Sequence, residues 1–456
     1  MMAYILLLTM SDDILKLSKK AATMILSIPK STKIRVVSHY DADGISAASI
    51  ICKALYREGY DFHVTLMRNP FTQGLERVSK EKNELIIFSD MGSGQIEIIE
   101  KLNCKVIIID HHQYLRSETN NNVLQINANL CGINGNYEAC GASLSYSVVK
   151  ALNPSNADLV PLAIAGATGD KQYIGGIRGY NKTVLDEGLE KGFLKKNIGM
   201  KLYGDSLFDA LYYSVDPYYA GLSGNKEGIL KLLGRLNIDE AVKIEELDDI
   251  QKRKLQSILI FKLIKNCCEK NILDTVIRKR YHSDVFCCEL ERFADILDAC
   301  GKGGNRDLGL AICLGDKKAF DEAEILEKEY KQIILDELLQ LEKDGFEEKN
   351  NIRYFYSSNS SLGGVIGGIA TNFIFDRNKP LLSIVRKNNE IHISCRGNQH
   401  LVAEGLDLGF AMKEAAAKLG GNGGGHKIAA GATLSSDKEK EFLDIVDTIL
   451  SKQMKV

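Results

Sequence analysis

Residues 34–44, IRVVSHYDADG, constrain this chain more than any other stretch. A run of strand-forming residues leads into His39, Asp41 and Asp43, which occupy alternate positions. Alternate side chains of an extended segment share one face, so these three would converge just past the carboxyl end of a strand, where open α/β sheets build ligand sites. Such a cluster is costly to bury unless a cation lies in it, which predicts a divalent metal. The plainer interpretation is a polar loop in which Asp41 caps a turn and Asp43 begins a helix.

Three later apolar segments also run into acids or imidazoles. The residues delivered in this way are Asp90, Asp110, His111, His112 and Asp170. Residues 85–88 and 105–109 read as short buried strands, and 159–169 form a further apolar stretch. Apolar strands that alternate with helices predict a parallel sheet covered on both faces, with its strand ends at one edge.

An aspartate after a strand is often only a helix cap, but four such delivery points together favour metal. Four aspartates and two or three histidines suit a pair of divalent ions with mixed oxygen and nitrogen ligands. This mixture favours manganese, with magnesium as the alternative. Zinc is disfavoured because no thiolate is suitably placed.

The composition limits the class of protein. A chain of 456 residues suggests two or three domains, and 45% apolar with 26% charged residues is usual for a globular protein. With a net charge of -2, any nucleic acid would have to be bound by a local basic groove. The 11 cysteines include no CxxC pair, which favours a reducing cytoplasm. No stretch is long enough to span a membrane, so we expect no membrane partner.

Two sets of motifs carry a family resemblance. The first set is SHYDADG at 38–44, Ser89-Asp90, Asp110-His111-His112 and Gly169-Asp170. In order and context it resembles the motifs of the DHH phosphoesterase superfamily. The second motif is Gly423-Gly424-Gly425-His426, followed by KIAAGA. It resembles the phosphate-binding motif of the C-terminal domain that is associated with this superfamily.

The middle of the chain resembles a subgroup, the archaeal RecJ-like nucleases. The similarity is carried by residues 214–222, which begin SVDPY, and by 297–311, which begin LDACG. Members usually have Asn and Arg on either side of Ala-Cys-Gly, where this chain has Asp298 and Lys302. The resemblance implies a role in archaeal DNA replication and repair, together with the GINS complex and the replicative helicase.

The superfamily resemblance also implies a role for single residues. The implied metal ligands are His39, Asp41, Asp43, Asp90, His111 and Asp170. Asp90 would bridge the two ions, while the ion that Asp41 and Asp43 each bind stays open. His112 corresponds to the imidazole that meets the scissile phosphate, and Asp110 to a residue that orients the histidine pair.

The C-terminal glycine run is a candidate phosphate site. In GGNGGGH, residues 420–426, little side chain is present, so backbone N–H groups can approach an anion closely. We expect Gly423, Gly424, Gly425 and His426 to contact a substrate phosphate. Arg396 would join them, because its planar guanidinium suits a pair of phosphate oxygens.

The predicted architecture is α/β, with an N-terminal parallel-sheet domain and the active site in an interdomain cleft. The expected regions are a DHH catalytic metal-binding domain at 1–190, a helical linker at 191–275, an inserted α/β module at 276–345, and a DHH-associated C-terminal substrate-binding domain at 352–456. The inserted module is a hypothetical partner-binding surface. Expected elements include helices at 248–265, 319–342 and 407–419 and strands at 352–356, 381–386 and 391–395.

We therefore expect a two-metal phosphodiesterase, and specifically an exonuclease on single-stranded DNA or RNA, because a narrow cleft admits one strand and not a duplex. One alternative is a hydrolase of short oligonucleotides or cyclic dinucleotides. Another is a non-catalytic subunit of a helicase complex, which the full set of ligands disfavours. A pyrophosphatase is disfavoured because that branch spaces its first motif differently.

Overall fold

The computed structural model describes residues 2–68, 72–266, 268–359 and 362–454. The chain forms two compact units: Met1–Ile198 with Lys279–Glu327, and Gly199–Arg278 with Lys328–Val456. The division falls inside the predicted module 276–345, because residues 279–327 belong to the first unit. The four predicted domains themselves stay a prediction.

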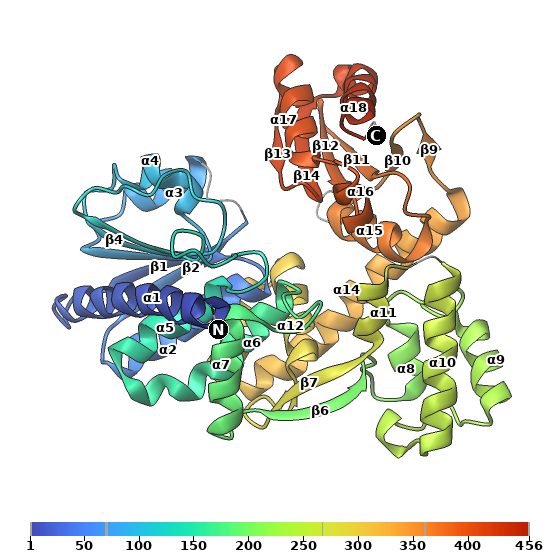
Figure 1. The fold of residues 1–456 in the computed structure, drawn as a ribbon, viewed down its shortest axis with the longest axis horizontal. Coiled ribbons are helices and arrows are strands. Elements are labelled where there is room, and N and C mark those ends of the chain that lie inside the picture. Colours follow the sequence, from blue (N-terminus) through green and yellow to red (C-terminus); the bar gives the residue numbers. More distant parts are fainter. Residues whose placement is uncertain (1, 69–71, 267, 360–361, 455–456) are drawn as a thin grey trace. The chain divides into compact units, whose positions relative to one another are not determined.

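A five-stranded sheet forms the centre of the first unit (Figure 1). The strand order is β2-β1-β3-β4-β5, and neighbouring strands are parallel. The strands are β1 (Ile34–His39), β2 (Phe62–Met67), β3 (Leu85–Ser89), β4 (Lys105–Asp110) and β5 (Val123–Asn127). The predicted N-terminal parallel sheet is therefore confirmed. Strand β5 was not predicted.

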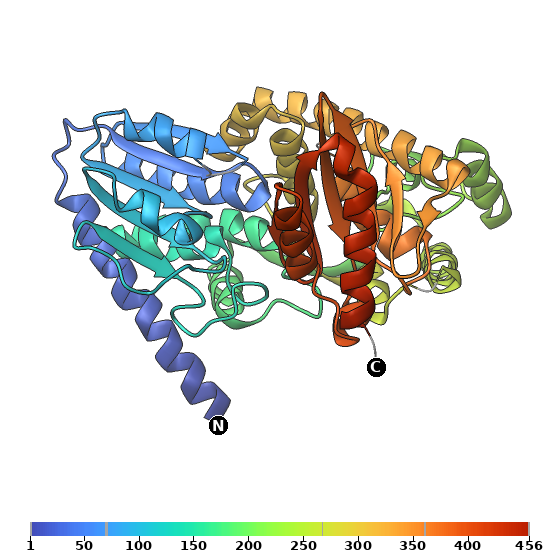
Figure 2. The same ribbon diagram turned by 90° about the horizontal axis from the view of Figure 1, so that it is seen from above.

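Helices cover both faces of this sheet. On one face lie α1 (Met2–Leu26), α2 (Ala42–Arg57) and α5 (Gly141–Leu152), and on the other lie α3 (Thr72–Ser79) and α4 (Ile96–Ile99) (Figure 1). Along β1, Ile34 and Val36 pack into the first of these cores and Val37 into the second. This is the burial expected of a parallel strand, whose two faces are both covered. Figure 2 shows α1 extending beyond the edge of the sheet.

The apolar stretch before Asp170 is a helix, α6 (Val160–Gly169), which packs against α2, α5 and α7 (Gly179–Glu190). Every residue from Val160 to Thr168 is buried. A helix buried on all sides has no polar stripe, so its sequence lacks a helical period and can be confused with a strand.

Residues 277–314 add a small α/β segment. Strands β6 (Lys195–Met200), β7 (Ile277–Ser283) and β8 (Cys288–Glu289) form a three-stranded sheet in that order. It is followed by α12 (Leu290–Lys302) and α13 (Arg306–Leu314), which pack against α2, and α12 also packs against α6. The approach is close at Gly301, where a Cβ atom would lie 1.8 Å from the carbonyl oxygen of Tyr40. Glycine is therefore required at this contact.

The second unit begins with helices, as the sequence predicts. They are α8 (Leu207–Tyr212), α9 (Lys226–Leu236), α10 (Asp249–Lys265) and α11 (Lys270–Val276). Asp248 caps α10, since its side chain accepts hydrogen bonds from the backbone N–H groups of Ile250 and Gln251. The predicted helix 319–342 is found as α14 (Lys317–Asp344).

A six-stranded sheet follows, in the order β13-β14-β12-β11-β10-β9. The strands are β9 (Glu347–Glu348), β10 (Arg353–Tyr356), β11 (Leu381–Lys387), β12 (Glu390–Arg396), β13 (Asn422–Gly425) and β14 (Ala429–Ser435). Only β10 and β11 pair in parallel among these described strands. The helices of this part are α15 (Gly363–Ile369), α16 (Gln399–Ala403), α17 (Leu408–Lys418) and α18 (Glu439–Gln453). The three strands predicted here are confirmed.

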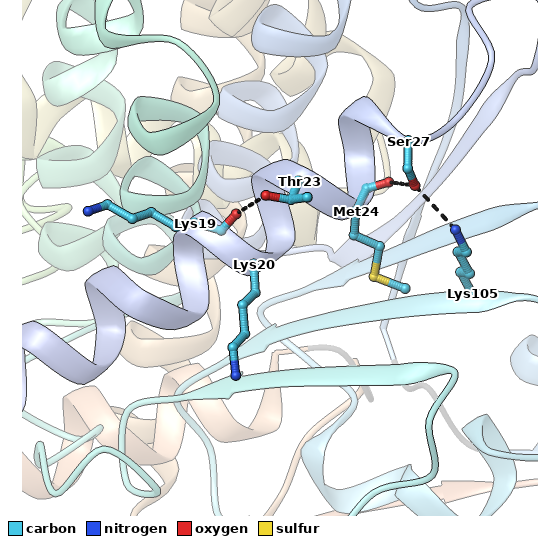
Figure 3. A pocket seen from close by; sticks show the side chains of 6 residues that line it. All are labelled: Lys19, Lys20, Thr23, Met24, Ser27 and Lys105. Atoms are coloured by element: carbon cyan, nitrogen blue, oxygen red, sulfur yellow. Dashed lines mark hydrogen bonds between the residues drawn. The ribbon is translucent and has the colours of Figure 1, made fainter.

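A shallow basic groove runs between α1 and the start of β4 (Figure 3). Its lining consists of Lys19, Lys20, Thr23, Met24, Ser27 and Lys105. The ammonium of Lys105 donates a hydrogen bond to the hydroxyl of Ser27 at 3.2 Å. Because β4 begins at Lys105 and ends at Asp110, this groove lies at the opposite end of the strand from the predicted metal ligands. Among the described residues, no helix has both the length and the apolar character needed to cross a bilayer.

Candidate metal centre

The first cluster of donor atoms forms where β1 ends. Nδ1 of His39 lies 2.8 Å from Oδ2 of Asp41 and 3.5 Å from Oδ2 of Asp90. Asp90 follows β3 with a left-handed φ of 56°, and its N–H donates to the carbonyl of Ile109 at 2.8 Å. This turn aims the Asp90 carboxylate across the sheet edge toward β1.

The second cluster surrounds the ring of His111. Its Nε2 atom lies 3.1 Å from Oδ1 of Asp90, 3.3 Å from Oδ2 of Asp170 and 3.7 Å from Oδ2 of Asp43. Asp170 is the C-cap residue of α6, and Asp43 lies in the first turn of α2. Two helices and two strands thus deliver side chains to one point.

Asp90 belongs to both clusters. Its Oδ2 atom faces His39 and its Oδ1 atom faces His111, so the two oxygens of one carboxylate are shared between two sets of donors. Within each of three groups, the donor atoms all lie within 4.8 Å of one another. The groups are His39 with Asp41 and Asp90, Asp43 with His111 and Asp170, and Asp90 with His111 and His112. All six ligands implied by the resemblance are therefore close together.

The backbone geometry at the first motif differs from the prediction. The strand ends at His39 rather than continuing in extended form through Asp43, and α2 begins at Ala42. Asp41 is the N-cap of α2 and accepts a hydrogen bond from the N–H of Gly44 at 3.1 Å. The plainer interpretation, in which Asp41 is a cap and Asp43 begins a helix, is correct for the backbone, and the same side chains still face the cluster.

Burial and mutual repulsion raise the pKa values of two acids in the cluster. Burial, together with the charges of Asp90 and Asp170, raises the pKa of Asp43 well above its ordinary value. Burial also raises the pKa of Asp170 to about 7, with a contribution from Asp90, although His111 opposes this. These two carboxylates resist ionisation where they lie, because each is buried beside further negative charge.

The imidazoles show the opposite effect. Burial alone would lower the pKa of His39, but Asp41 and Asp90 raise it to about 12. The pKa of His111 is likewise raised well above its ordinary value against the effect of burial, by Asp90 and Asp170. The site thus attracts positive charge. Four carboxylates and two imidazoles of this kind fit hard divalent ions such as Mn²⁺ or Mg²⁺.

The N-terminus of α5 fixes Asp43. The backbone N–H groups of Gly141 and Ala142 donate to its two oxygens at 2.6 and 2.9 Å. Helix N-termini favour anions, so these bonds orient the carboxylate. A Cβ atom on Gly141 would lie 2.5 Å from Cβ of Asp90, and one on Gly166 would lie 2.3 Å from Oδ1 of Asp43. Both glycines therefore make room for the acids.

The Asp110 carboxylate forms hydrogen bonds with both residues of the histidine pair. Its carboxylate accepts hydrogen bonds from the backbone N–H groups of Ser93, His111 and His112 at 2.9, 2.8 and 3.1 Å. Nδ1 of His112 lies 2.8 Å from Oδ1 of the same carboxylate. Burial would raise the pKa of Asp110, but the neighbouring His112 and these hydrogen bonds hold it well below its ordinary value. The His112 side chain is 43% exposed, so its ring remains accessible.

Several supporting residues were not predicted. Asn127 Nδ2 donates to the carbonyl of His112 at 3.0 Å and to the hydroxyl of Ser93 at 2.8 Å. Asn129 Nδ2 donates to the carbonyls of His111 and His112 at 2.9 and 3.1 Å. These hydrogen bonds fix the backbone of His111 and His112. Their alternate spacing after the apolar residues of β5 was the signal that could have revealed them.

The segment 279–327 also contacts the first motif. Oδ1 of Asp298 accepts a hydrogen bond from the N–H of Ala42 at 2.9 Å, and its other oxygen pairs with Lys302. Burial would raise the pKa of Asp41; instead His39 holds it far below its ordinary value, and Lys302 adds to this effect. The two positions where this chain differs from the subgroup pattern thus border the candidate metal centre.

The predicted phosphate motif lies wholly in the second unit, and the metal cluster wholly in the first. The glycine run is not a loop, since Gly423, Gly424 and Gly425 form β13, which pairs with β14. A Cβ atom on Gly423 would lie 2.3 Å from the carbonyl oxygen of Met412, so this glycine is needed for packing against α17. A Cβ atom on Gly424 would meet nothing within 4 Å in the part of the chain that the structure describes.

Arg396 and His426 lie at the same end of this sheet. Arg396 of β12 is in register with Ala429 of β14, and the N–H of His426 donates to the carbonyl of Ala429 at 2.8 Å. The two backbones are therefore separated by one strand, or roughly 10 Å.

Comparison with known proteins agrees with this architecture. Residues 33–168 match the N-terminal domain of the DHH family, residues 351–452 match the DHHA1 domain, and residues 181–304 match the archaeal Cdc45 family. The chain belongs to the DHH family, and its fold is RecJ-like. It is 34% identical over 429 residues to an uncharacterized protein of Methanocaldococcus jannaschii, and the match covers 92% of this chain and 94% of the relative.

Two solved structures share the fold. RecJ from Thermus thermophilus in complex with Mn²⁺ has 17% identity and a TM-score of 0.61; the match covers 96% of this chain and 55% of that RecJ. CDC45 from Entamoeba histolytica has 12% identity and a TM-score of 0.63, covering 92% of this chain and 96% of CDC45. The chain thus spans about half the length of the Thermus RecJ. The RecJ-like DHH fold that the sequence predicts is confirmed.

Proposed function

We propose that this protein is a metal-dependent phosphodiesterase that acts as an exonuclease on single-stranded DNA or RNA. The observation that carries the proposal is the position of Asp90, whose two oxygens face two different sets of donor atoms. A carboxylate placed in this way is suited to bridge a pair of ions, which is the arrangement used in two-metal hydrolysis of phosphate esters. The DHH family membership and the likeness to a Mn²⁺ complex of RecJ support it.

The proposed ligands divide naturally between the two clusters. His39 and Asp41 would hold one ion, Asp43, His111 and Asp170 the other, and Asp90 would bridge them. Four carboxylates balance the charge of two divalent cations, which would relieve the repulsion around Asp43 and Asp170. Manganese is the preferred ion and magnesium the alternative. When bound, such ions supply an activated water at neutral pH and neutralise charge that builds on the phosphate.

His112 would act on the scissile phosphate. Burial and the adjacent His111 lower its pKa, but Asp110 and Asp90 outweigh them and raise it above the ordinary value. Asp110 accepts from Nδ1, which leaves the Nε2–H of a protonated ring to donate a hydrogen bond to a phosphate oxygen. His112 would thus hold a proton against the charge that develops during hydrolysis.

In the second unit, Arg396, Gly423, Gly424, Gly425 and His426 are proposed to bind a phosphate of the substrate. Gly424 supports this role because the space beside it is open. Gly423 is also needed for packing against α17. The DHHA1 match over residues 351–452 supports the assignment, because it is the domain type that the resemblance implies for this motif.

We further propose that the protein works in DNA replication and repair with the GINS complex and the replicative helicase. The archaeal Cdc45 match over 181–304 and the likeness to CDC45 support this role. Residues 276–345 are the proposed partner-binding region. The same likeness favours a competing proposal, a non-catalytic subunit, but the complete set of donors around Asp90 argues for catalysis.

A nuclease assay tests the proposal. The purified chain is incubated with 5′- or 3′-labelled single-stranded DNA, RNA and duplex, in Mn²⁺, Mg²⁺ or EDTA, and with oligonucleotides of graded length. We expect stepwise shortening of single strands that requires metal and is lost in Asp43→Asn and Asp90→Asn. Cleavage restricted to dinucleotides would support the short-substrate alternative. No cleavage in any metal would support the non-catalytic subunit.

A further inference from the structure

The side chain of Gln172 belongs to a buried hydrogen-bond network beside the metal centre. It lies two residues after Asp170 and is 2% exposed. Its Nε2 atom donates hydrogen bonds to the carbonyls of Gly135 and Ala139 at 2.9 and 3.0 Å. Its Oε1 atom accepts a hydrogen bond from Nδ2 of Asn181 on α7. Both amide hydrogens and the carbonyl thus have partners, which fixes the orientation of the amide.

The carbonyl of Gly135 also contacts the metal centre. Nδ1 of His111 lies 2.6 Å from this oxygen. The N–H of Gly135 donates to Oδ1 of Asn129 at 3.1 Å, so the peptide is held on its other side as well. A Cβ atom on Gly135 would lie 1.9 Å from the carbonyl oxygen of His111. Only glycine allows this close approach, and the carbonyl can therefore reach the imidazole.

This hydrogen bond decides which nitrogen of His111 can bind a metal. A carbonyl only accepts, so Nδ1 must carry the proton, and Nε2 is the nitrogen that can present a lone pair. Nε2 is the atom that faces Asp43, Asp90 and Asp170. Partners of this kind fix the ring and its tautomer in metal sites.

The turn after α6 controls both sides of the same ring. Asp170 faces Nε2, while Gln172 acts on Nδ1 through the Gly135 carbonyl. Between them, Lys171 has a left-handed φ of 56°, and the N–H of Gln172 donates to the carbonyl of Ala167 at 2.9 Å. The backbone reversal directs Asp170 to Nε2 of the imidazole and Gln172 to the carbonyl that meets Nδ1.

We propose that Gln172 is a positioning residue of the metal centre: by holding the Gly135 carbonyl against Nδ1 of His111, it keeps Nε2 of that ring directed at the metal. Asn181 supports this role because its hydrogen bond to Oε1 fixes the orientation of the Gln172 amide. The inference rests on the proposed function only in that His111 binds metal. Leucine or methionine at 172 would fill the space but would release the carbonyl, and glutamate could not donate to it.

The test compares Gln172→Met with a matched control, Gln125→Met. Gln125 is also a buried amide, 7% exposed on β5, and neither of its amide atoms has a hydrogen-bond partner within the described part of the chain. Mn²⁺ binding is measured from the electron paramagnetic resonance signal of the free ion. We expect Gln172→Met to weaken Mn²⁺ affinity about tenfold, the lower end of the range for residues behind a ligand. Gln125→Met should bind Mn²⁺ like the wild type.

A spectroscopic measurement separates positioning from a merely structural role. In metal-free protein, the hydrogen-bonded Nδ1–H of His111 should give a downfield, slowly exchanging proton resonance, assigned by its loss in His111→Gln. We expect it to persist in Gln125→Met and to move upfield or exchange rapidly in Gln172→Met. Asn181→Leu removes only the hydrogen bond to Oε1 of Gln172 and should show the same change to a smaller extent. This variant replaces Gln172→Met in the test if Gln172→Met does not fold.

Two results would overturn the inference: wild-type Mn²⁺ affinity in folded Gln172→Met, or an unchanged His111 proton resonance in that variant. If instead the wild type binds no Mn²⁺ while the resonance still depends on Gln172, the proposed function fails and the positioning of His111 stands.

Discussion

The burial of Asp170 beside Asp90 predicts that removing the charge of Asp170 stabilises the metal-free protein. We consider Asp170→Asn, which preserves the shape of the side chain and removes its charge. Burial, together with Asp90, raises the pKa of Asp170 from 3.8 to about 7. In the unfolded chain the carboxyl ionises near 3.8, so as the pH rises the unfolded state releases this proton first. The folded state then loses stability between about pH 4 and pH 7, and the loss is complete above pH 7.

The magnitude follows from this difference. Three pKa units correspond to about 4 kcal/mol at 1.36 kcal/mol for each unit. This difference already includes the attraction between Oδ2 and Nε2 of His111, 3.3 Å apart, which lowers the pKa, so nothing further is subtracted for the loss of that ion pair. The net gain in the free energy of unfolding at pH 8 is therefore about 4 kcal/mol. For a unit of this size that raises Tm by roughly 8–16 °C.

Thermal unfolding in EDTA, followed for both proteins at pH 5 and pH 8, measures the effect. We expect Asp170→Asn to exceed the wild type at pH 8, with a smaller difference at pH 5, where the wild-type carboxyl keeps its proton in the folded state. Added Mn²⁺ should stabilise the wild type more than the variant, because the variant lacks one proposed ligand. A lower Tm for Asp170→Asn than for the wild type in EDTA at pH 8 would refute the reasoning.

Three further changes test other parts of the site. Gly141→Ala introduces a Cβ atom 2.5 Å from that of Asp90; we expect a loss of about 1–3 kcal/mol in chemical denaturation and weaker Mn²⁺ binding by calorimetry. Asp110→Asn should lower nuclease activity roughly 10- to 100-fold with little change in Mn²⁺ affinity, since the partner of Nδ1 of His112 loses its charge. Asp298→Ala removes the acceptor for the first N–H of α2. We expect it to lower the free energy of unfolding by about 1 kcal/mol and to weaken Mn²⁺ binding. Asp298→Asn keeps the acceptor and should stay close to the wild type in both measurements.

The sequence predicted the first unit well because its main features are local. Apolar runs of strand length, each followed by an acid or a histidine, indicated the sheet edge and brought Asp90 and His111 to one place. The same reasoning misassigned the backbone at Asp43, which lies in a helix, because side chains at alternate positions can also converge across a helix N-terminus. It left the stretch before Asp170 unresolved, since a helix buried on all sides carries no period.

Other features could not be predicted because they depend on distant contacts. The hydrogen bonds of Gln172 join a turn after α6 to a loop 37 residues earlier, and an isolated glutamine in a sequence gives no sign of this. The glycine run was expected to contact a phosphate through its backbone, but Gly423 is also needed for packing, because α17 lies too close for a side chain at that position. Glycine spacing alone does not separate these two uses.

The close approach of Gly301 to Tyr40 predicts an order of assembly for the candidate metal centre during synthesis. All six proposed ligands leave the ribosome within the first 170 residues, yet α12, which covers the loop between His39 and α2, starts at Leu290. A nascent chain that has exposed only its first 198 residues therefore holds every donor while the loop still lacks its cover. Full metal retention should appear only after α12 has emerged and packed.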